Sequence, residues 1–406
     1  MGVFDRMRRL GLVALAVTAS LGLGAGSAPA ASPVAASCAS TAMRGMWIST
    51  VSNLDWPSKP GLSVADQQRE YRALLDMAVA RHLNTVVVQV RPAADAFWPS
   101  PHEPWSRWLT GAQGQDPGYD PLAFLVEETH ARGLQLHAWF NPLRVSTQGD
   151  PAQLVPDHPA RRHPEWVFSY GGQLYYNPGI PEVRAFVLDA MLDAVRRYAV
   201  DGVHFDDYFY PYPKGGEPIP DAETFAAHGG GFANIEDWRR DNINQLVREM
   251  GERVKAVRPS AKFGVSPFGI WRNRAEDPNG SDTRGLSSYS AIYADTRLWV
   301  KEGWVDYIAP QVYWEVGHAQ ADYAALVSWW SDVVAGTGVE LYIGQAAHKV
   351  GTTPAWDDGE LTEHLTLNQR HPQVHGDVFF RAGSLTSNAA AAMDRVVTEH
   401  YATCRS

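Results

Sequence analysis

Short apolar segments alternate along this chain with longer amphipathic segments, and this alternation constrains the fold more than any other feature. The apolar segments are rich in Val, Ile, Phe, Tyr and Trp, and they span residues 45–51, 85–91, 134–141, 202–208, 262–268, 305–314, 340–344 and 377–381. The amphipathic segments lie near residues 64–82, 119–132, 181–200, 236–258, 288–302, 319–335, 358–370 and 387–401. Eight strands that alternate with eight helices predict a closed (β/α)8 TIM barrel. A doubly wound open sheet is the alternative, although no GxGxxG or GxxxxGK motif follows any expected strand.

The amino-terminal residues have the pattern of an export signal. Arginines at positions 6, 8 and 9 precede an apolar run over residues 10–25, and Ala-Pro-Ala at 28–30 fits a cleavage site. We therefore expect a signal peptide over residues 1–30, a short linker over 31–42 and one barrel domain over 43–404. No later segment is apolar enough to cross a bilayer. These features predict a secreted protein, extracellular or associated with the cell wall, and we expect a monomer.

The net charge indicates which partners to exclude, and the cysteine content indicates a covalent link. The net charge is −10 and no run of like charges stands out, so a nucleic-acid partner is not expected. The chain has two cysteines, Cys38 and Cys404, one at each end of the expected mature protein. In an oxidising compartment such a pair predicts a disulfide that joins the two ends of the barrel.

The alternation of side chains along the strands locates the expected active site. Aliphatic residues of each strand must cover the helices, so the opposite set faces the barrel axis. That inward set is polar and aromatic in four strands, and it gathers at the carboxyl ends, where barrel active sites lie. Its members include Gln89, Arg91, Gln135, His137, Trp139, Asn141, His204, Asp206, Tyr208, Gln311, Tyr313 and Glu315.

Three carboxylates are the candidate catalytic residues. Asp206 ends the fourth strand and faces inward, so we expect it to act as nucleophile or charge stabiliser, with Arg91 beside it keeping it ionised. Hydrolysis of a glycoside needs a second carboxyl group, and Glu315 has the right parity and strand end for an acid/base. Asp207 has the opposite parity, and it enters the site only if the strand ends before it. Asp207 is therefore the second candidate for the general acid, after Glu315.

The expected substrate-binding residues surround these carboxylates. Exposed Trp and Tyr rings suit the apolar faces of sugars. The long loop after the second strand, RPAADAFWPSPHEPWSRWLTG, is dense in aromatic residues. The candidates are Arg91, Asp95, Asn141, His204, Tyr208, Trp271, Gln311, Tyr313 and Trp314.

Several stretches of the sequence together resemble one bacterial family. RGMWISTVSNLDWP, NTVVVQVRPAADAFWPS, LHAWFNP, DGVHFDDYFYP, VSPFGIWRN and DYIAPQVYW occur in the order found in the glycosyl hydrolase-like family ten. The resemblance implies a TIM barrel that hydrolyses glycosides, and for some members peptidoglycan glycan strands that lack peptides are the substrate. DGVHFDDY also resembles the fourth-strand motif of other barrel glycosidases, which implies an active-site role for Asp206. It departs from the chitinase pattern DxxDxDxE, because His204 and Tyr208 stand where an Asp and the acid Glu occur.

Two alternative functions are also compatible with the sequence. His204 and Asp206 share a face, which a metal-dependent hydrolase or deacetylase would require, but no HxH or HExxH spacing appears. A barrel that binds glycans without cleaving them is the other alternative. We expect no cofactor and no metal, and a cell-wall polysaccharide as the partner.

Overall fold

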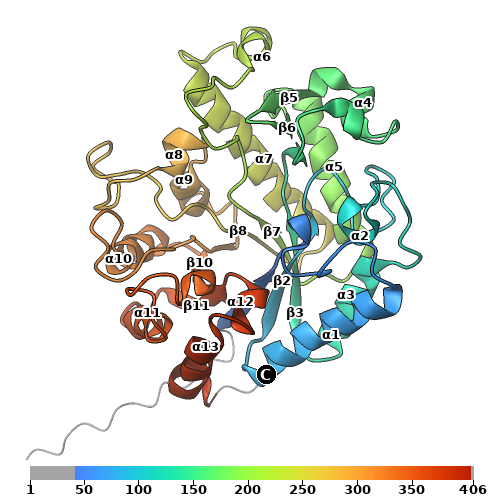
Figure 1. Ribbon diagram of the computed structural model, residues 1–406. Helices are drawn as coiled ribbons and strands as arrows, with labels where there is room; N and C mark the ends of the chain where they lie inside the picture. The colour runs from blue at the N-terminus through green and yellow to red at the C-terminus, as the bar shows by residue number, and fades with distance from the viewer. Residues whose placement is uncertain (1–41, 404–406) are drawn as a thin grey trace, which may run out of the picture. The chain divides into compact units, whose positions relative to one another are not determined.

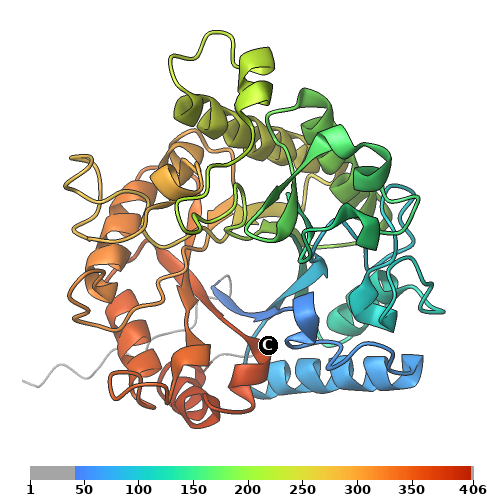
Figure 2. The same ribbon diagram turned by 45° about the horizontal axis from the view of Figure 1, so that its top comes forward.

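Eight parallel strands close into a barrel in the computed structural model, which describes residues 42–403 (Figures 1 and 2). The predicted signal peptide, most of the linker and both cysteines lie outside the described residues. Around the barrel the strands are β1 (Met43–Ile48), β2 (Thr85–Arg91), β3 (Gln135–Phe140), β7 (Gly202–Phe205), β8 (Lys262–Val265), β9 (Tyr307–Ile308), β10 (Glu340–Gln345) and β11 (Val374–Phe379). β11 pairs in parallel with β1 and closes the circle. The predicted TIM barrel is confirmed.

Helices surround the strands, as Figure 2 shows from above. One helix follows each barrel strand and returns the chain to the next: α1 (Val64–Ala80), α3 (Pro121–His130), α5 (Pro181–Arg197), α7 (Ile235–Val257), α9 (Thr296–Lys301), α10 (Tyr323–Val334), α11 (Glu360–Asn368) and α13 (Ala390–Val396). Shorter helices lie in the loops: α2 (Arg107–Thr110), α4 (Pro159–Arg162), α6 (Ala222–His228), α8 (Ser288–Ala291) and α12 (Ala382–Leu385). No described helix is long and apolar enough to span a membrane.

Local sequence signals explain where the main helices begin. The side chains of Ser63, Asp120 and Asn234 each accept a backbone N–H of the first turn, so they cap α1, α3 and α7. Pro181 opens α5, where a missing N–H costs nothing. The apolar faces of these helices then pack on the aliphatic side of the strands.

The barrel interior has its own small core, in which half of the residues are aromatic. It contains Met43, Trp47, Val87, Trp139, Tyr307, Ala309, Tyr342 and Val378. Two glycines make room for it: a Cβ on Gly202 would lie 2.6 Å from the ring of His137, and one on Gly264 would lie 2.2 Å from Tyr307. The rings therefore sit directly over the backbone of the neighbouring strands, and they fill the barrel below the carboxyl ends.

A three-stranded antiparallel sheet lies between β3 and α5 in the chain and interrupts the alternation of barrel strands and helices. It consists of β4 (Arg144–Ser146), β5 (Val167–Tyr170) and β6 (Gln173–Tyr176), and we call residues 144–176 the insert. Sequence analysis did not predict it. A signal was present, because WVFSYGGQLYY is a hairpin pattern with Gly171 and Gly172 at the turn, both at positive φ (58° and 81°). The insert brings new side chains to the carboxyl ends of the strands.

Candidate active site

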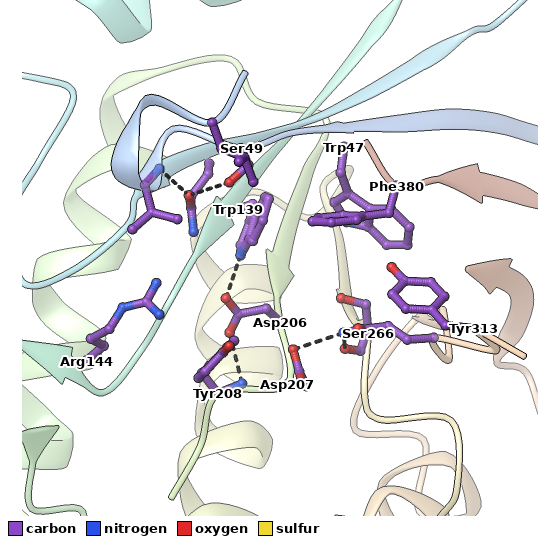
Figure 3. A pocket seen from close by; sticks show the side chains of 14 residues that line it. Trp47, Ser49, Trp139, Arg144, Asp206, Asp207, Tyr208, Ser266, Tyr313 and Phe380 are labelled. Atoms are coloured by element: carbon purple, nitrogen blue, oxygen red, sulfur yellow. Dashed lines mark hydrogen bonds between the residues drawn. The ribbon is translucent and has the colours of Figure 1, made fainter. Parts of the chain in front are cut away.

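A pocket of about 320 Å³ opens at the carboxyl ends of the barrel strands (Figure 3). Its lining comes from β1, β2 and β3, from the insert and from the segments that follow β1, β7, β8, β9 and β11. The residues are Trp47, Ser49, Val51, Leu54, Gln89, Trp139, Arg144, Asp206, Asp207, Tyr208, Ser266, Gln311, Tyr313 and Phe380. Asp206 and Asp207 are the acidic residues among them.

Asp206 follows β7 directly and is held by three donors. Its carboxylate accepts the indole N–H of Trp139 at 2.9 Å, the backbone N–H of Tyr208 at 3.1 Å and the side-chain amide of Asn141 at 3.2 Å. Figure 3 shows the bond from Trp139, which reaches Asp206 from the neighbouring strand. These donors fix the direction in which the carboxylate faces the pocket.

Asp207 also turns into the pocket, because β7 ends at Phe205 and strand parity no longer applies. The Tyr212 hydroxyl donates to one of its oxygens, and Gln311 donates its amide to the other at 2.9 Å. Gln311 in turn donates to the backbone oxygen of Ser266 at 2.9 Å, which ties the segment after β9 to the segment after β8. Two neighbouring carboxyl groups thus share one site.

Burial makes it difficult for both carboxyl groups to be charged at once. Burial and the adjacent Asp207 carboxylate raise the pKa of Asp206 to about 6, while Arg144 and the donors from Trp139 and Tyr208 oppose the rise. Burial also raises the pKa of Asp207 above its ordinary value, against the hydrogen bonds from Tyr212 and Gln311. A pair of this kind ionises in two separated steps, so between these steps it offers one carboxylate and one proton.

Arg144 places a positive charge at the same pocket from the first strand of the insert. Its guanidinium donates through Nε and Nη2 to the backbone oxygen of Pro92, at 3.1 and 2.8 Å, and lies 4.9 Å from the centre of the Tyr208 ring. In Figure 3 it stands on one side of the two aspartates, and Trp47, Tyr313 and Phe380 stand on the other. The pocket therefore has a cationic wall and an aromatic wall.

The floor of the pocket is a chain of hydrogen bonds in which His204 is neutral. The Trp47 indole N–H donates to His204 Nε2 at 3.2 Å, so that nitrogen carries no proton. His204 Nδ1 and His137 Nδ1 each lie 2.9 Å from the Tyr307 hydroxyl. Burial lowers the pKa of both histidines, that of His137 to about 4. His204 thus supports the site from below and is fully engaged with protein atoms.

Comparison with known proteins identifies the family. The model of the family described as glycosyl hydrolase-like 10 matches residues 42–359. The chain is 50% identical to glycosyl hydrolase YngK of Bacillus subtilis over 365 residues, which cover 88% of this chain and 72% of that protein. It is 43% identical to glycosyl hydrolase DigH of Escherichia coli over 381 residues, which cover 88% of this chain and 86% of that protein. The chain belongs to the glycosyl hydrolase-like 10 family. It is a glycoside hydrolase.

Solved structures at low identity share the fold of this glycosyl hydrolase-like 10 member. The glycoside hydrolase domain of PgaB (BpsB) from Bordetella bronchiseptica superimposes with a TM-score of 0.55 at 13% identity, over 87% of this chain and 98% of that one. The catalytic domain of β-amylase from Paenibacillus polymyxa gives 0.54 at 11% identity, over 89% of this chain and 98% of that one. Both likenesses show the TIM barrel.

Of the site residues predicted from the sequence, five line the pocket of this family member: Asp206, Asp207, Tyr208, Gln311 and Tyr313. Asn141 and His204 lie behind the lining, where they bond to Asp206 and to the pocket residues Trp47 and Ser266. The expectation that the polar strand face points inward therefore holds for β3 and β7.

The predicted pairing of Arg91 with Asp206 is wrong. Arg91 is fully buried, and its guanidinium forms a double hydrogen bond with Glu103, at 2.6 and 2.7 Å, under the loop after β2. The register of β2 against β3 shifts between Gln89 and Arg91, so the side chain no longer follows the parity of the strand. The nearby cation is Arg144, and the pKa of Asp206 is raised, where the sequence predicted that it would be lowered.

Four other candidates lie away from the pocket lining. Asp95 is buried near Arg91 and Glu103, and burial raises its pKa to about 6. Trp271 stacks on Trp329 and donates to Asp295 at 2.8 Å. The ring of Trp314 packs edge-on against Phe268. Glu315 is half-buried and accepts the indole N–H of Trp356 at 3.1 Å.

Sequence analysis missed several residues that line the pocket. It placed Gln89 and Trp139 on the inward face without assigning them a role, and it did not consider Trp47, Ser266 or Arg144. Strand parity gives a usable signal for Trp47, which shares the inward face of β1 with Met43 and Gly45, whereas Met46 and Ile48 face the helices. Arg144 carries no such signal, because it follows a turn after β3.

Proposed function

We propose that this glycoside hydrolase cleaves peptidoglycan glycan strands that lack peptides, without a metal ion, by means of Asp206 and Asp207. The observation that carries the proposal is the pair of buried carboxyl groups in one pocket, each with a raised pKa. Hydrolysis through an oxocarbenium-like transition state needs a negative charge near the anomeric carbon and a proton donor at the leaving oxygen. The coupled pair can supply both in the pH range between its two ionisation steps.

In this mechanism Asp206 is the nucleophile or charge stabiliser. Donors from Trp139, Asn141 and the Tyr208 backbone favour its ionised form and hold it in place. Asp207 then keeps the proton and gives it to the leaving oxygen. We prefer Asp207 to Glu315 as the acid, because Asp207 lines the pocket while the Glu315 carboxylate is bonded to Trp356.

The shape of the pocket and the export signal favour a cell-wall glycan. Trp47, Trp139, Tyr313 and Phe380 offer ring faces on which sugars can stack. The sequence resemblance to family members that act on peptide-free strands points to the same substrate. A signal peptide over residues 1–30 would deliver the enzyme to the compartment in which this glycan occurs.

Export also supports a disulfide between Cys38 and Cys404. Both cysteines lie outside the described residues, but the described ends of the chain come together. The guanidinium of Arg44, on β1, lies 5.8 Å from the centre of the ring of Tyr401, which follows α13. A bridge between segments that meet in this way would be compatible with the barrel.

The two alternatives have less support. A metal-dependent hydrolase needs a cluster of ligands, and the described residues contain no group of three His, Cys, Asp or Glu side chains placed to hold an ion. His204 in particular is held through both ring nitrogens by Trp47, Ser266 and Tyr307. A barrel that only binds glycans would have no need for two buried carboxyl groups with raised pKa values.

The test is digestion of peptide-free peptidoglycan strands, chitin and an α-glucan by the purified mature enzyme, followed by mass spectrometry. We expect cleavage of the peptidoglycan strands, and Asp206→Asn and Asp207→Asn are each expected to lower turnover by about a thousandfold or more. The half-exposed Asp189→Asn on α5, outside the pocket lining, is the control and should retain full activity. Wild-type turnover by Asp206→Asn would overturn the mechanism, and cleavage of chitin or α-glucan alone would overturn the substrate.

Glu315→Gln separates the two candidate acids. We expect activity within a few-fold of the wild type, because the glutamine oxygen can still accept the Trp356 N–H. If this variant is inactive while Asp207→Asn remains active, Glu315 is the acid.

A further inference from the structure

Two hydrogen-bond donors of the pocket have no partner in the described protein. One is Nε2 of Gln89, a side chain that is 1% exposed. The other is Nη1 of Arg144, which makes no hydrogen bond to residues 42–403, whereas Nε and Nη2 are bonded to Pro92. Buried donors in native proteins are nearly always satisfied, so the unused Nε2 of Gln89 in the pocket lining indicates a ligand, and Nη1 of Arg144 is available to bind the same ligand.

The orientation of the Gln89 amide is fixed by its neighbours. Its Oε1 accepts the backbone N–H of Thr50 at 3.1 Å and that of Val51 at 2.9 Å. An amide flip would set the NH2 group against these two donors, so Nε2 is the atom left without a partner. Gln89 therefore offers an N–H bond to an oxygen atom of whatever occupies the pocket.

The guanidinium of Arg144 also makes no direct ion pair with a carboxylate of the described chain. Within the described chain, no N–O distance of 4.0 Å or less joins Arg144 to Asp206, to Asp207 or to any other carboxylate. Its position is nevertheless set, by the Pro92 carbonyl and by the Tyr208 ring below it. Figure 3 shows the guanidinium end turned toward the pocket. A buried cation held in place beside a substrate site is a suitable partner for an anionic group of the substrate.

We propose that Arg144, with Gln89 as a second donor, binds a carboxylate carried by the sugar at the cleavage site. This proposal rests on the proposed function, because in peptide-free strands each muramic acid residue carries a free lactyl carboxylate. When a peptide is attached, that carboxylate is converted into a neutral amide. The pocket would then distinguish bare strands from substituted ones by charge as well as by size.

The experiment compares two forms of one substrate. Peptide-free glycan strands are used as such, and a second portion has its lactyl carboxylates converted into methyl amides. For the wild type we expect kcat/KM to be about ten- to a hundredfold higher on the carboxylate form, the range expected for a hydrogen bond between charged groups. The measured quantity is this ratio, which a general loss of catalytic rate leaves unchanged.

Three variants assign the preference to Arg144. Arg144→Gln should bring the ratio to within about twofold of one, and Arg144→Lys, which keeps the charge without the planar fork, should give an intermediate ratio. Arg161→Gln is the matched control, because Arg161 belongs to the same insert and also donates to a backbone oxygen, that of Leu154, but lies outside the pocket lining. It should keep the wild-type ratio.

The outcomes separate the two proposals. If the wild type cleaves neither form, the proposed function fails. If it cleaves both forms equally, or if folded Arg144→Gln and Arg144→Lys keep the full preference, the proposed function stands and the role of Arg144 is refuted. Equal cleavage of the two forms by the wild type would refute the proposal even if both variants failed to fold.

Discussion

Asp206 and Asp207 are adjacent in sequence and buried in one pocket, so the protons of the pair are lost in two coupled steps. The active form of the proposed mechanism has one carboxylate and one carboxylic acid. When the pH falls below the first step both groups are protonated, and the nucleophile is lost. We therefore expect kcat/KM to fall on the acid side with an apparent pKa above the ordinary value for an aspartate, because burial raises the pKa of both groups.

Tyr212→Phe tests the origin of this acid limb. The Tyr212 hydroxyl donates to Asp207 and stabilises its ionised form, so its removal should raise the pKa values of the pair. A hydrogen bond of about 1 kcal/mol corresponds to a shift of about 0.7 pH unit. Measurement of kcat/KM from pH 4 to 9 should show the acid limb displaced to higher pH.

Tyr198→Phe is the control, because it removes a similar Tyr–Asp hydrogen bond, to Asp120 at 2.6 Å, outside the pocket. It should leave the pH profile unchanged. An acid limb that moves to lower pH in Tyr212→Phe would contradict the role assigned to this hydroxyl.

Among the elements, the strands of the barrel depend on close approach of aromatic rings to glycine. A Cβ at Gly264 on β8 would lie 2.2 Å from the ring of Tyr307 on β9, which is itself hydrogen-bonded to His137 and His204. Gly264→Ala should therefore destabilise the fold by about 1–3 kcal/mol, since the ring has no free space to move into. Gly338→Ala is the control, because nothing lies within 4 Å of its added carbon. Urea denaturation measures both, and equal stabilities would contradict the packing argument.

The elements themselves were largely predictable from the sequence. Alternating hydrophobic segments gave all eight barrel strands and the main helices, because a buried parallel strand and an amphipathic helix have different periodicities. The predicted sixth strand over 305–314 was too long. Only Tyr307–Ile308 forms the ladder of β9, and Pro310, which has no N–H, interrupts its continuation. The helix expected over 288–302 is divided into α8 and α9, with Tyr293 at a positive φ of 56° between them.

The site was less predictable than the fold. Strand parity placed Asp206 correctly relative to β7, because a strand fixes the direction of successive side chains. Parity gave the wrong position for the side chain of Arg91, because a register shift intervenes. It gave no prediction for Arg144, whose position depends on the turn after β3. Residues beyond the end of a strand are positioned by tertiary contacts that the sequence alone does not specify.

For the whole molecule, the predicted link between Cys38 and Cys404 would close nearly the entire chain into one loop. A disulfide of this kind restricts the unfolded chain, and we expect its loss to cost about 2–4 kcal/mol of stability. Intact-mass measurement before and after reduction should show the gain of two hydrogens, and the Cys38→Ser, Cys404→Ser double variant should melt at a lower temperature than the oxidised wild type. Reactive thiols in the native exported protein would rule the bridge out.

A second global property is the dependence of stability on pH. Asp377 on β11 is buried with Gln345 and Asn368, and burial raises its pKa to about 7. Between its ordinary pKa and this value the folded state binds the proton more tightly than the unfolded state, so stability falls as the pH rises through this window. The slope is at most about 1.4 kcal/mol per pH unit for one group.

Asp377→Asn removes this titration, and its unfolding free energy should therefore decline less steeply than that of the wild type between pH 4.5 and 7. Denaturation in urea at a series of pH values gives both curves. The exposed Asp358→Asn serves as control and should follow the wild type. Parallel curves for Asp377→Asn and the wild type would contradict the assignment.

The insert and the barrel contribute different parts of the pocket, since the two aspartates follow β7 while Arg144 belongs to residues 144–176. In the proposed mechanism, the two catalytic carboxyl groups and the guanidinium that selects the substituent are thus encoded in separate stretches of the gene. A duplicated copy could exchange or lose its insert and acquire a new glycan preference while keeping the hydrolytic apparatus intact. For protein engineering, this makes the insert a natural unit to transplant between relatives.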